Sequence, residues 1–228
     1  MLAYDVGMNN GDDARYYLAK GYEVIAIEAN PALCEEVGIK LKEFVDKGRL
    51  QILNVAVAES EGTSLEFHID VQEHVRSSLQ PLKGRQTRAV TVTGRKLSNI
   101  IREHGAPDFL KIDVEHADQI SLMDMIAAGM KPPHISAEAH SFEILLLLWK
   151  MGYKEFRLLN GRNVHLEYRN APIATQDGST VKYTFPKHSS GPFGDDYPAP
   201  WRNIQDVCAE WLHRHALFGP GWFDIHAR

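Results

Sequence analysis

The chain has 228 residues, of which 44% are hydrophobic, and its formal net charge is −5. At roughly 100–200 residues per domain, this length suits one domain, or one domain with an extension. The acidic balance argues against a general nucleic-acid binder, and no apolar run approaches the roughly 18 residues of a membrane helix. Two cysteines are no disulfide framework, so we expect a cytoplasmic protein with reduced thiols.

Short β-type runs alternate with helical patterns through the first two thirds of the chain. Strands are expected where short apolar runs end at turn residues, and helices where apolar residues recur at helical spacing or capping residues stand. The expected strands are residues 2–6, 22–28, 50–58, 108–114 and 134–139, with an additional pair at 65–69 and 89–93. The expected helices are residues 11–20, 31–45, 118–128 and 142–151.

This alternation predicts an α/β fold in which helices cover both faces of a mostly parallel sheet. Two further β-type runs, residues 153–159 and 164–168, flank the dipeptide Asn160-Gly161. Asn-Gly is typical of tight hairpin turns. We therefore expect a closing hairpin that adds one antiparallel strand at or near an edge of the sheet.

The composition changes near residue 170, after which the chain is rich in Pro, Gly, Ser and Asp. An amphipathic helix is expected from Ile204 onward, and three of the four tryptophans lie in this tail. We expect residues 1–170 to form the main domain and residues 171–228 to form an extension that caps the mouth of the same sheet.

The first predicted loop, DVGMNNG at residues 5–11, lies between a strand and a helix, where α/β sheets bind nucleotides. Its glycine pair also fits an ordinary tight turn, but Glu28 follows Gly7 by 21 residues, at a strand end where a carboxylate can accept ribose hydroxyls. Asp5 would repel a pyrophosphate and attract an ammonium group. The third glycine of the dinucleotide-binding fingerprint is lacking, and so is the Gly-Lys-Ser/Thr sequence of a phosphate-binding P-loop. These features favour S-adenosylmethionine and disfavour NAD.

Three motifs together are similar to the FkbM family of S-adenosylmethionine-dependent methyltransferases. They are DVGMNNG (residues 5–11), IEANP (27–31) and LKIDVE (110–115), and the resemblance extends over about residues 2–170. HSSGPFGDD (188–196) is similar to a tail found in some bacterial members. The resemblance implies a Rossmann-like class I methyltransferase sheet, and O-methylation of a hydroxyl on a sugar, glycan or secondary metabolite.

The resemblance also implies which residues contact the cofactor. Asp5, Gly7 and Gly11 would line the methionine end, Glu28 would hold the ribose, and Asn54 would lie near the adenine. Asp113 would lie near the amino group or the transferred methyl, and Asn10 is a further candidate. The chain departs from the family at His116, where a glycine is usual.

Ionisable residues alternate at two expected strand ends, in Asp113-x-Glu115-His116 and in Glu138-x-His140. A hydroxyl must lose its proton as the methyl arrives, so His140, Glu115, Glu138 and His116 are the candidate catalytic bases. A metal site is a second interpretation, because such groups could hold Mg²⁺ and activate the hydroxyl. In a third, they simply hydrogen-bond one another and the cofactor.

Two other functions stay open: a non-catalytic module that binds S-adenosylmethionine or a nucleoside, and a less favoured NAD-binding enzyme. As partner we expect a small-molecule or glycan acceptor, with no nucleic acid and no membrane. The oligomeric state stays open, with a homo-oligomer as one option. Residues 77–79 could reach the pocket, but a polar surface loop is the favoured interpretation of this segment.

Overall fold

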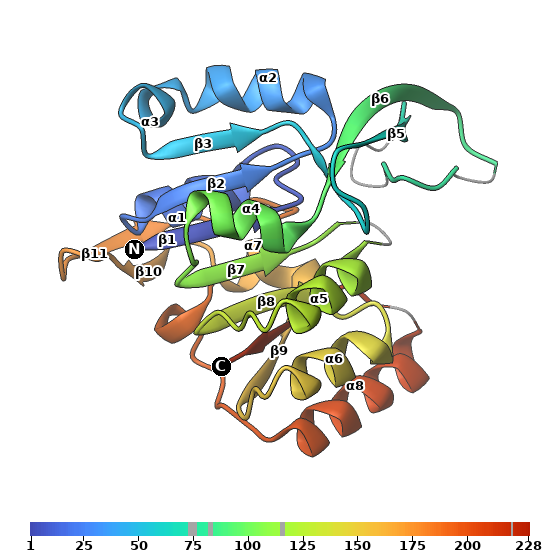
Figure 1. Ribbon diagram of the computed structural model, residues 1–228. Helices are drawn as coiled ribbons and strands as arrows, with labels where there is room; N and C mark the ends of the chain where they lie inside the picture. The colour runs from blue at the N-terminus through green and yellow to red at the C-terminus, as the bar shows by residue number, and fades with distance from the viewer. Residues whose placement is uncertain (73–76, 82–83, 115–116, 220) are drawn as a thin grey trace.

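A seven-stranded sheet forms the centre of the computed structural model, which describes residues 1–72, 77–81, 84–114, 117–219 and 221–228 (Figure 1). The strands lie in the order β3-β2-β1-β7-β8-β12-β9, and β12 alone among these seven runs in the direction opposite to the other six. In this order they are Leu50–Leu53, Glu23–Ile27, Leu2–Val6, Phe109–Ile112, His134–Glu138, Phe223–Ala227 and Phe156–Asn160. This arrangement confirms the expected α/β sheet of the class I methyltransferase type.

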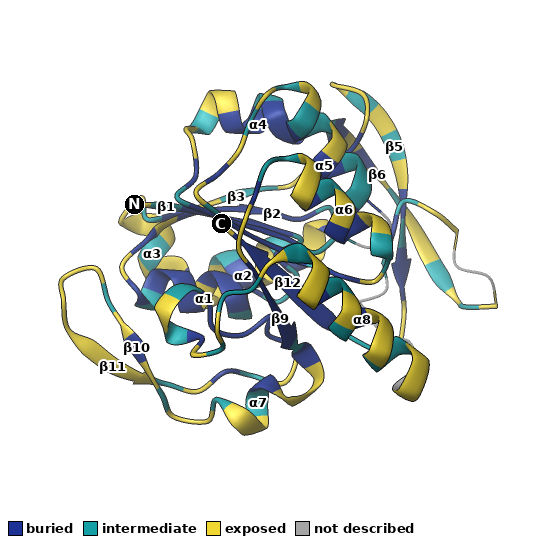
Figure 2. Cartoon of the chain, turned by 90° about the horizontal axis from the view of Figure 1, so that it is seen from below, coloured by how far each residue is buried: buried dark blue, intermediate teal, exposed yellow. Residues whose placement is uncertain are grey.

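Helices cover both faces of the sheet (Figure 2). On one face, α4, α5, α6 and α8 bury a core that includes Ile100, Leu145 and Trp211. On the other face, α1 and α2 bury a second core with Tyr17 and Val37. The helices are α1 (Asp12–Ala19), α2 (Pro31–Lys40), α3 (Lys42–Asp46), α4 (Leu97–His104), α5 (Asp118–Ala127), α6 (Phe142–Lys150), α7 (Val164–Glu167) and α8 (Ile204–Phe218).

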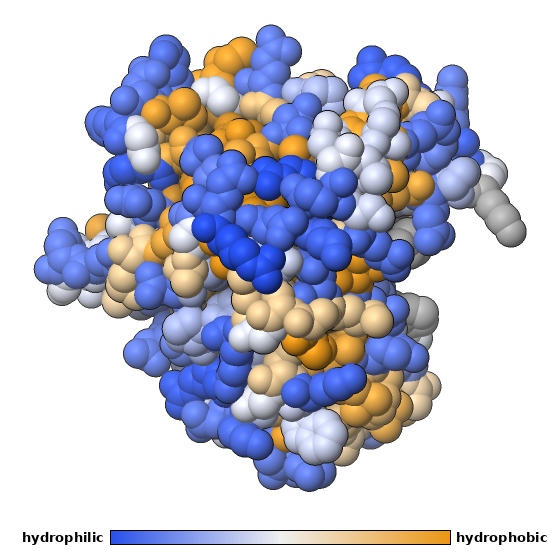
Figure 3. Space-filling model, in the orientation of Figure 1, coloured by the Kyte–Doolittle hydropathy of each residue, from blue (hydrophilic) through white to orange (hydrophobic). Residues whose placement is uncertain are grey.

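The surface is largely hydrophilic in the view of Figure 3, with hydrophobic residues exposed towards α6 and α8. Leu146 and Trp149 of α6 and Leu212 of α8 are among the exposed large apolar side chains. Among the helices of the described residues, none has both the length and the apolar character that crossing a bilayer requires.

The predicted strand at 50–58 divides at Asn54, which turns the chain out of the central sheet. The Asn54 side-chain amide donates to the carbonyls of Glu28 and Ala29 at 2.9 and 3.0 Å. The chain then enters a separate three-stranded sheet of β4 (Ala56–Val57), β6 (Thr87–Arg95) and β5 (Thr63–Asp70), in that order. The antiparallel β5–β6 pair confirms the predicted additional strands.

The predicted hairpin at Asn160-Gly161 is wrong. The Asn160 side chain accepts a hydrogen bond from the Arg162 N–H at 3.1 Å and so caps a short 3₁₀ helix, Gly161–Asn163, which α7 follows. Asparagine favours helix N-caps as well as turns. A side chain at Gly161 would also lie 2.4 Å from the Trp222 ring. The expected strand at 164–168 is therefore helical.

The antiparallel strand near the edge comes instead from the end of the chain. β12 inserts between β8 and β9, and Ile225 pairs with Ala137 on one side and with Leu158 on the other. All five residues of β12 are buried. The tail also forms a small hairpin of β10 (Ala171–Ala174) and β11 (Thr180–Tyr183). β12 thus belongs to the central sheet, and the description of residues 171–228 as a capping extension stays a prediction.

Because β12 lies inside the sheet, truncating its side chains should destabilise the whole domain. Ile225 is fully buried, and Ile225→Ala should lower the free energy of unfolding by about 2–5 kcal/mol. Leu217→Ala on α8 is the control, because Leu217 is 61% exposed and should cost about 0.5 kcal/mol or less. Urea denaturation of both variants measures this difference, and equal stabilities would contradict the placement of β12.

Candidate functional site

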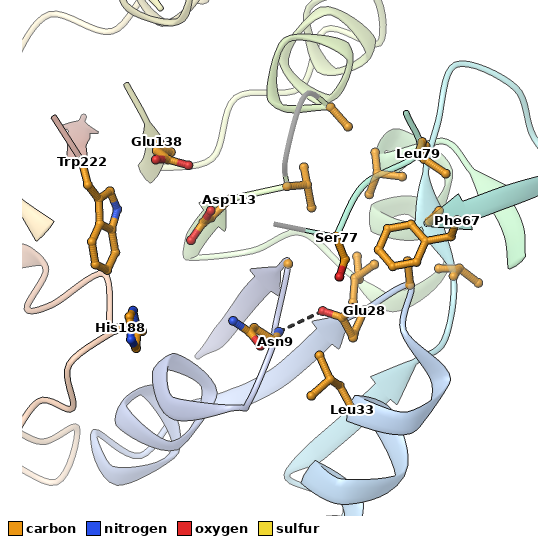
Figure 4. Close-up of a pocket in the computed structure, with 18 of the residues that line it drawn as sticks. Asn9, Glu28, Leu33, Phe67, Ser77, Leu79, Asp113, Glu138, His188 and Trp222 are labelled. Carbon is orange, nitrogen blue, oxygen red and sulfur yellow. Dashed lines mark hydrogen bonds between the residues drawn. The ribbon is translucent and has the colours of Figure 1, made fainter. Parts of the chain in front are cut away.

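A pocket of about 560 Å³ opens at the carboxyl ends of the central strands. Residues at or just beyond the ends of β1, β2, β7 and β8 form one side, and residues from the three-stranded sheet and the tail complete it (Figure 4). Ligands of open α/β sheets bind at this edge. Among the predicted cofactor and catalytic residues that the structure describes, four line the pocket: Gly7, Glu28, Asp113 and Glu138.

Gly7 is required by the close contact between the first loop and β7. Its φ is +86°, and a Cβ atom there would lie 1.8 Å from the Asp113 carbonyl oxygen. Any side chain would therefore push the loop away from Asp113. Gly11 has a different role: a Cβ there would lie 2.7 Å from Val37, so this glycine lets α1 pack against α2 and does not line the pocket.

Glu28 is held at the tip of β2 by the backbone on both sides of it. Its Oε2 accepts from the Asn9 N–H at 2.9 Å, and its Oε1 accepts from the Asn30 N–H at 2.7 Å. Burial raises the pKa of Glu28, and these two hydrogen bonds act in the opposite direction. Each carboxylate oxygen retains acceptor capacity for a further donor. The carboxylate is thus fixed at the pocket wall (Figure 4).

A buried lysine that sequence reasoning missed connects the elements around the pocket. Lys111 Nζ on β7 lies 3.2 Å from Asp5 Oδ1, 3.4 Å from Asp13 Oδ2 and 3.3 Å from Asp113 Oδ2. It also donates to the Gly7 carbonyl at 3.0 Å. Burial alone would lower the pKa of Lys111, but the carboxylates raise it well above its ordinary value. A lysine within the apolar run FLKI was the available signal.

Asp5 meets this lysine instead of a ligand. Its side chain is fully buried, and it does not line the pocket, so the expectation that Asp5 lines the methionine end is corrected. Burial raises the pKa of Asp5 to about 7, although Lys111 opposes the shift. Of the three carboxylates around Lys111, Asp113 is the most exposed, at 27% against 0% and 6%.

Asn10 and Asn54 serve the local backbone and do not line the pocket. The Asn10 side-chain oxygen accepts from the Asp12 N–H at 3.1 Å, at the start of α1. Asn54 holds the end of β2, as described above. The next residue, Val55, does line the pocket, so Asn54 lies close to the region where we expected the adenine.

The predicted bases are only partly brought together. Glu138 lines the pocket, whereas His140 does not. His140 Nδ1 lies 4.0 Å from Glu138 Oε2 and 3.9 Å from Asp118 Oδ2. Glu115 and His116 lie outside the described residues. Within the described part of the chain, no group of three or more His, Cys, Asp or Glu side chains is arranged to hold a metal ion.

The opposite ends of the pocket differ in chemistry. Apolar side chains lie near Glu28 and include Leu33, Phe67 and Leu79. Ser77 and Leu79 both line the pocket, so the favoured interpretation of their segment as a surface loop is wrong. The other end holds Asp113 and Glu138, with two tail residues, His188 and Trp222 (Figure 4). Sequence reasoning did not select Phe67, His188 or Trp222, because their contacts are distant in sequence.

The model of the FkbM methyltransferase domain matches residues 5–154. This chain therefore belongs to the FkbM family of S-adenosylmethionine-dependent methyltransferases. No curated protein sequence matches it.

Similar solved structures include precorrin-6y C5,15-methyltransferase from Geobacter metallireducens GS-15, with 11% identity, coverage of 100% of this chain and 78% of that one, and a TM-score of 0.43. A precorrin 8w decarboxylase from Methanobacterium thermoautotrophicum has 14% identity, coverage of 100% and 81%, and a TM-score of 0.44. The C-terminal domain of precorrin-6Y C5,15-methyltransferase from Rhodobacter capsulatus has 13% identity, coverage of 100% and 80%, and a TM-score of 0.41.

The raised pKa of Asp5 predicts a pH dependence of stability. The folded protein holds this proton up to about pH 7, whereas the ordinary value for the unfolded chain is 3.8. The resulting stabilisation is present below pH 3.8 and is lost as the pH rises through 7. Asp5→Asn should therefore reduce the fall in unfolding free energy between pH 5 and pH 8, by an amount on the order of a few kcal/mol.

Urea denaturation at both pH values measures this slope. Asp177→Asn is the control, because the pKa of Asp177, lowered to about 2 mainly by the Thr175 hydroxyl, lies below this range in the folded protein. Its ordinary value of 3.8 lies below the range as well, so the control should keep the wild-type slope. An Asp5→Asn slope equal to that of wild type would contradict the assignment.

Proposed function

We propose that the protein is an O-methyltransferase that moves the methyl group of S-adenosylmethionine to a hydroxyl of a sugar, glycan or secondary metabolite. The observation that best supports this proposal is the charge around Lys111, where one lysine contacts three carboxylates. The most exposed of these carboxylates, Asp113, faces the pocket. This excess of negative charge suits a ligand that carries positive charge next to a nucleoside.

The residues of the pocket fit the parts of this cofactor. Glu28 would accept the ribose hydroxyls, since both of its oxygens are held at the pocket wall. The apolar end, with Leu33, Phe67 and Leu79, would take the adenine. Asp113 would face the amino group or the sulfonium. When bound, S-adenosylmethionine supplies a methyl group that its positively charged sulfur already activates.

The polar end of the pocket would receive the acceptor. We assign Glu138 as the base, because it is the predicted base that the described pocket contains. Its carboxylate would take the hydroxyl proton as the new oxygen–carbon bond forms, and His140, 4.0 Å away, would support that carboxylate. The other part of the rate enhancement would come from holding the hydroxyl in line with the methyl group.

The acceptor that we propose is a small molecule or glycan, since the carboxylates of the pocket and the net charge of −5 would repel a nucleic-acid backbone. A cytoplasmic location belongs to the same proposal. A cofactor-binding module without activity is the competing function. Transfer of tritium from methyl-labelled S-adenosylmethionine to the small-molecule fraction of a cell extract supports the enzyme, and binding without any transfer supports the module.

Glu28→Gln should weaken the binding of S-adenosylhomocysteine about ten- to a hundred-fold, because charge-assisted hydrogen bonds to the ribose are lost. Isothermal titration calorimetry measures the affinity. Glu35→Gln, an exposed change on the neighbouring helix α2, is the control and should bind like wild type. Wild-type affinity in a folded Glu28→Gln variant would show that the ribose binds elsewhere.

Glu138→Gln should lower the rate of tritium transfer by about 10²–10⁴, because the amide cannot take the proton. The shape of the side chain is kept, so the affinity for S-adenosylhomocysteine should be unchanged. His140→Ala should lower transfer less, since His140 acts through Glu138. If His140→Ala abolished transfer and Glu138→Gln retained it, the two assignments would have to be exchanged.

A further inference from the structure

Buried polar contacts fasten the tail segment of residues 189–196 to helix α1. Ser189 Oγ donates to Asp13 Oδ1 at 2.6 Å, and the Ser190 N–H donates to the same oxygen at 3.0 Å. Asp13, Ser189 and Ser190 are all buried. Hydrogen bonds to an ionised carboxylate are among the stronger ones in proteins. The path of the chain at Ser189 is therefore fixed relative to α1.

The rest of the segment is held as firmly. The Phe193 ring stacks on Phe109 of β7 with centroids 3.8 Å apart and an interplanar angle of 7°. Asp196 accepts from the Tyr16 hydroxyl at 2.7 Å. Gly191 has φ +85°, and a Cβ atom there would lie 2.9 Å from Leu159. Packing, charge and backbone conformation thus determine where the segment lies.

The tail segment of residues 189–196 is therefore an anchor. His188 is the residue immediately before this anchor, and it lines the pocket. Figure 4 places it beside Trp222, away from Phe67 and Leu79 at the opposite end. The preceding residue, Lys187, is exposed and does not line the pocket. The anchor therefore presents one imidazole to the end of the pocket that holds Asp113.

The anchor is also joined to the cofactor side of the pocket. Asp13, which holds Ser189 and Ser190, lies 3.4 Å from Lys111 Nζ. Lys111 in turn contacts Asp113 and the Gly7 carbonyl. One network of contacts therefore sets the positions of both His188 and the loop that contains Gly7. A tail segment that only covered the core would not need such a connection.

We propose that His188 is a residue of the acceptor site, and that Asp13 and Ser189 are positioning residues for it. This inference rests on the proposed methyl transfer to a hydroxyl. The imidazole would hydrogen-bond the acceptor and turn its hydroxyl towards the methyl group, while Glu138 takes the proton. The Trp222 ring would supply an apolar face beside it. The acceptor class that fits is a compact polyhydroxylated molecule with one apolar face.

The test measures tritium transfer from methyl-labelled S-adenosylmethionine to serial dilutions of the small-molecule fraction of a cell extract. His188→Ala should raise the half-saturating extract concentration about tenfold, the effect of one lost hydrogen bond in a binding site. The affinity for S-adenosylhomocysteine, measured by calorimetry, should be unchanged. His188→Gln retains a donor and an acceptor and should recover part of the loss. Ser189→Ala should shift the half-saturation in the same direction by less.

Lys187→Ala is the matched control and should behave as wild type. Unchanged half-saturation in His188→Ala would overturn the inference. So would loss of S-adenosylhomocysteine affinity in that variant, since His188 would then belong to the cofactor site. No transfer by the wild-type protein would reject the proposed function itself, and the acceptor role of His188 with it, whereas a defect confined to His188→Ala bears on this residue alone.

Discussion

The buried ammonium group of Lys111 is the interaction on which the site depends. Removing a lysine from water costs several kcal/mol unless charges and hydrogen bonds replace the water. Here Asp5, Asp13, Asp113 and the Gly7 carbonyl surround it. These partners come from β1, its following loop, α1 and the residue after β7, so one cation holds the loop of residues 7–11 against α1 and β7.

The same network extends to the end of the chain. Asp13 binds the serines of residues 189–190 as well as Lys111. Beyond them, β12 enters the sheet between β8 and β9, which places the preceding residue, Trp222, at the pocket. The tail is therefore needed for both the sheet and the pocket. This dependence explains why a segment of unusual composition contains so many buried aromatic residues.

Local sequence signals predicted the parallel strands and the pocket residues at the ends of β1, β2 and β7. Alternation of strands and helices gave the fold class, and Gly7, Glu28 and Asp113 could be found because each stands at the end of a predicted strand or in its loop. The signals failed where one residue type serves two purposes. Asn160 was expected in a turn but caps a 3₁₀ helix. Asp5 was expected to attract the ammonium group of a ligand, but it contacts the ammonium group of Lys111.

Contacts between distant segments were beyond local reasoning. No pattern around residues 223–227 indicates that they pair with residues 135–138 and 156–160, and none around His188 indicates a pocket formed by residues near 113 and 138. Such pairings depend on which strand edges and apolar faces remain uncovered after the local elements form. Gly7, Glu28, Asp113 and Glu138 were thus predictable as pocket residues, whereas His188 and Trp222 were not.

Calorimetric titration with S-adenosylmethionine, S-adenosylhomocysteine and NAD tests the central claim most directly. The excess of carboxylates at Lys111 and the position of Glu28 predict binding of both sulfur nucleosides at one site per chain, with no binding of NAD, whose pyrophosphate these carboxylates would repel. Tight binding of NAD with no heat from either sulfur nucleoside would contradict the account.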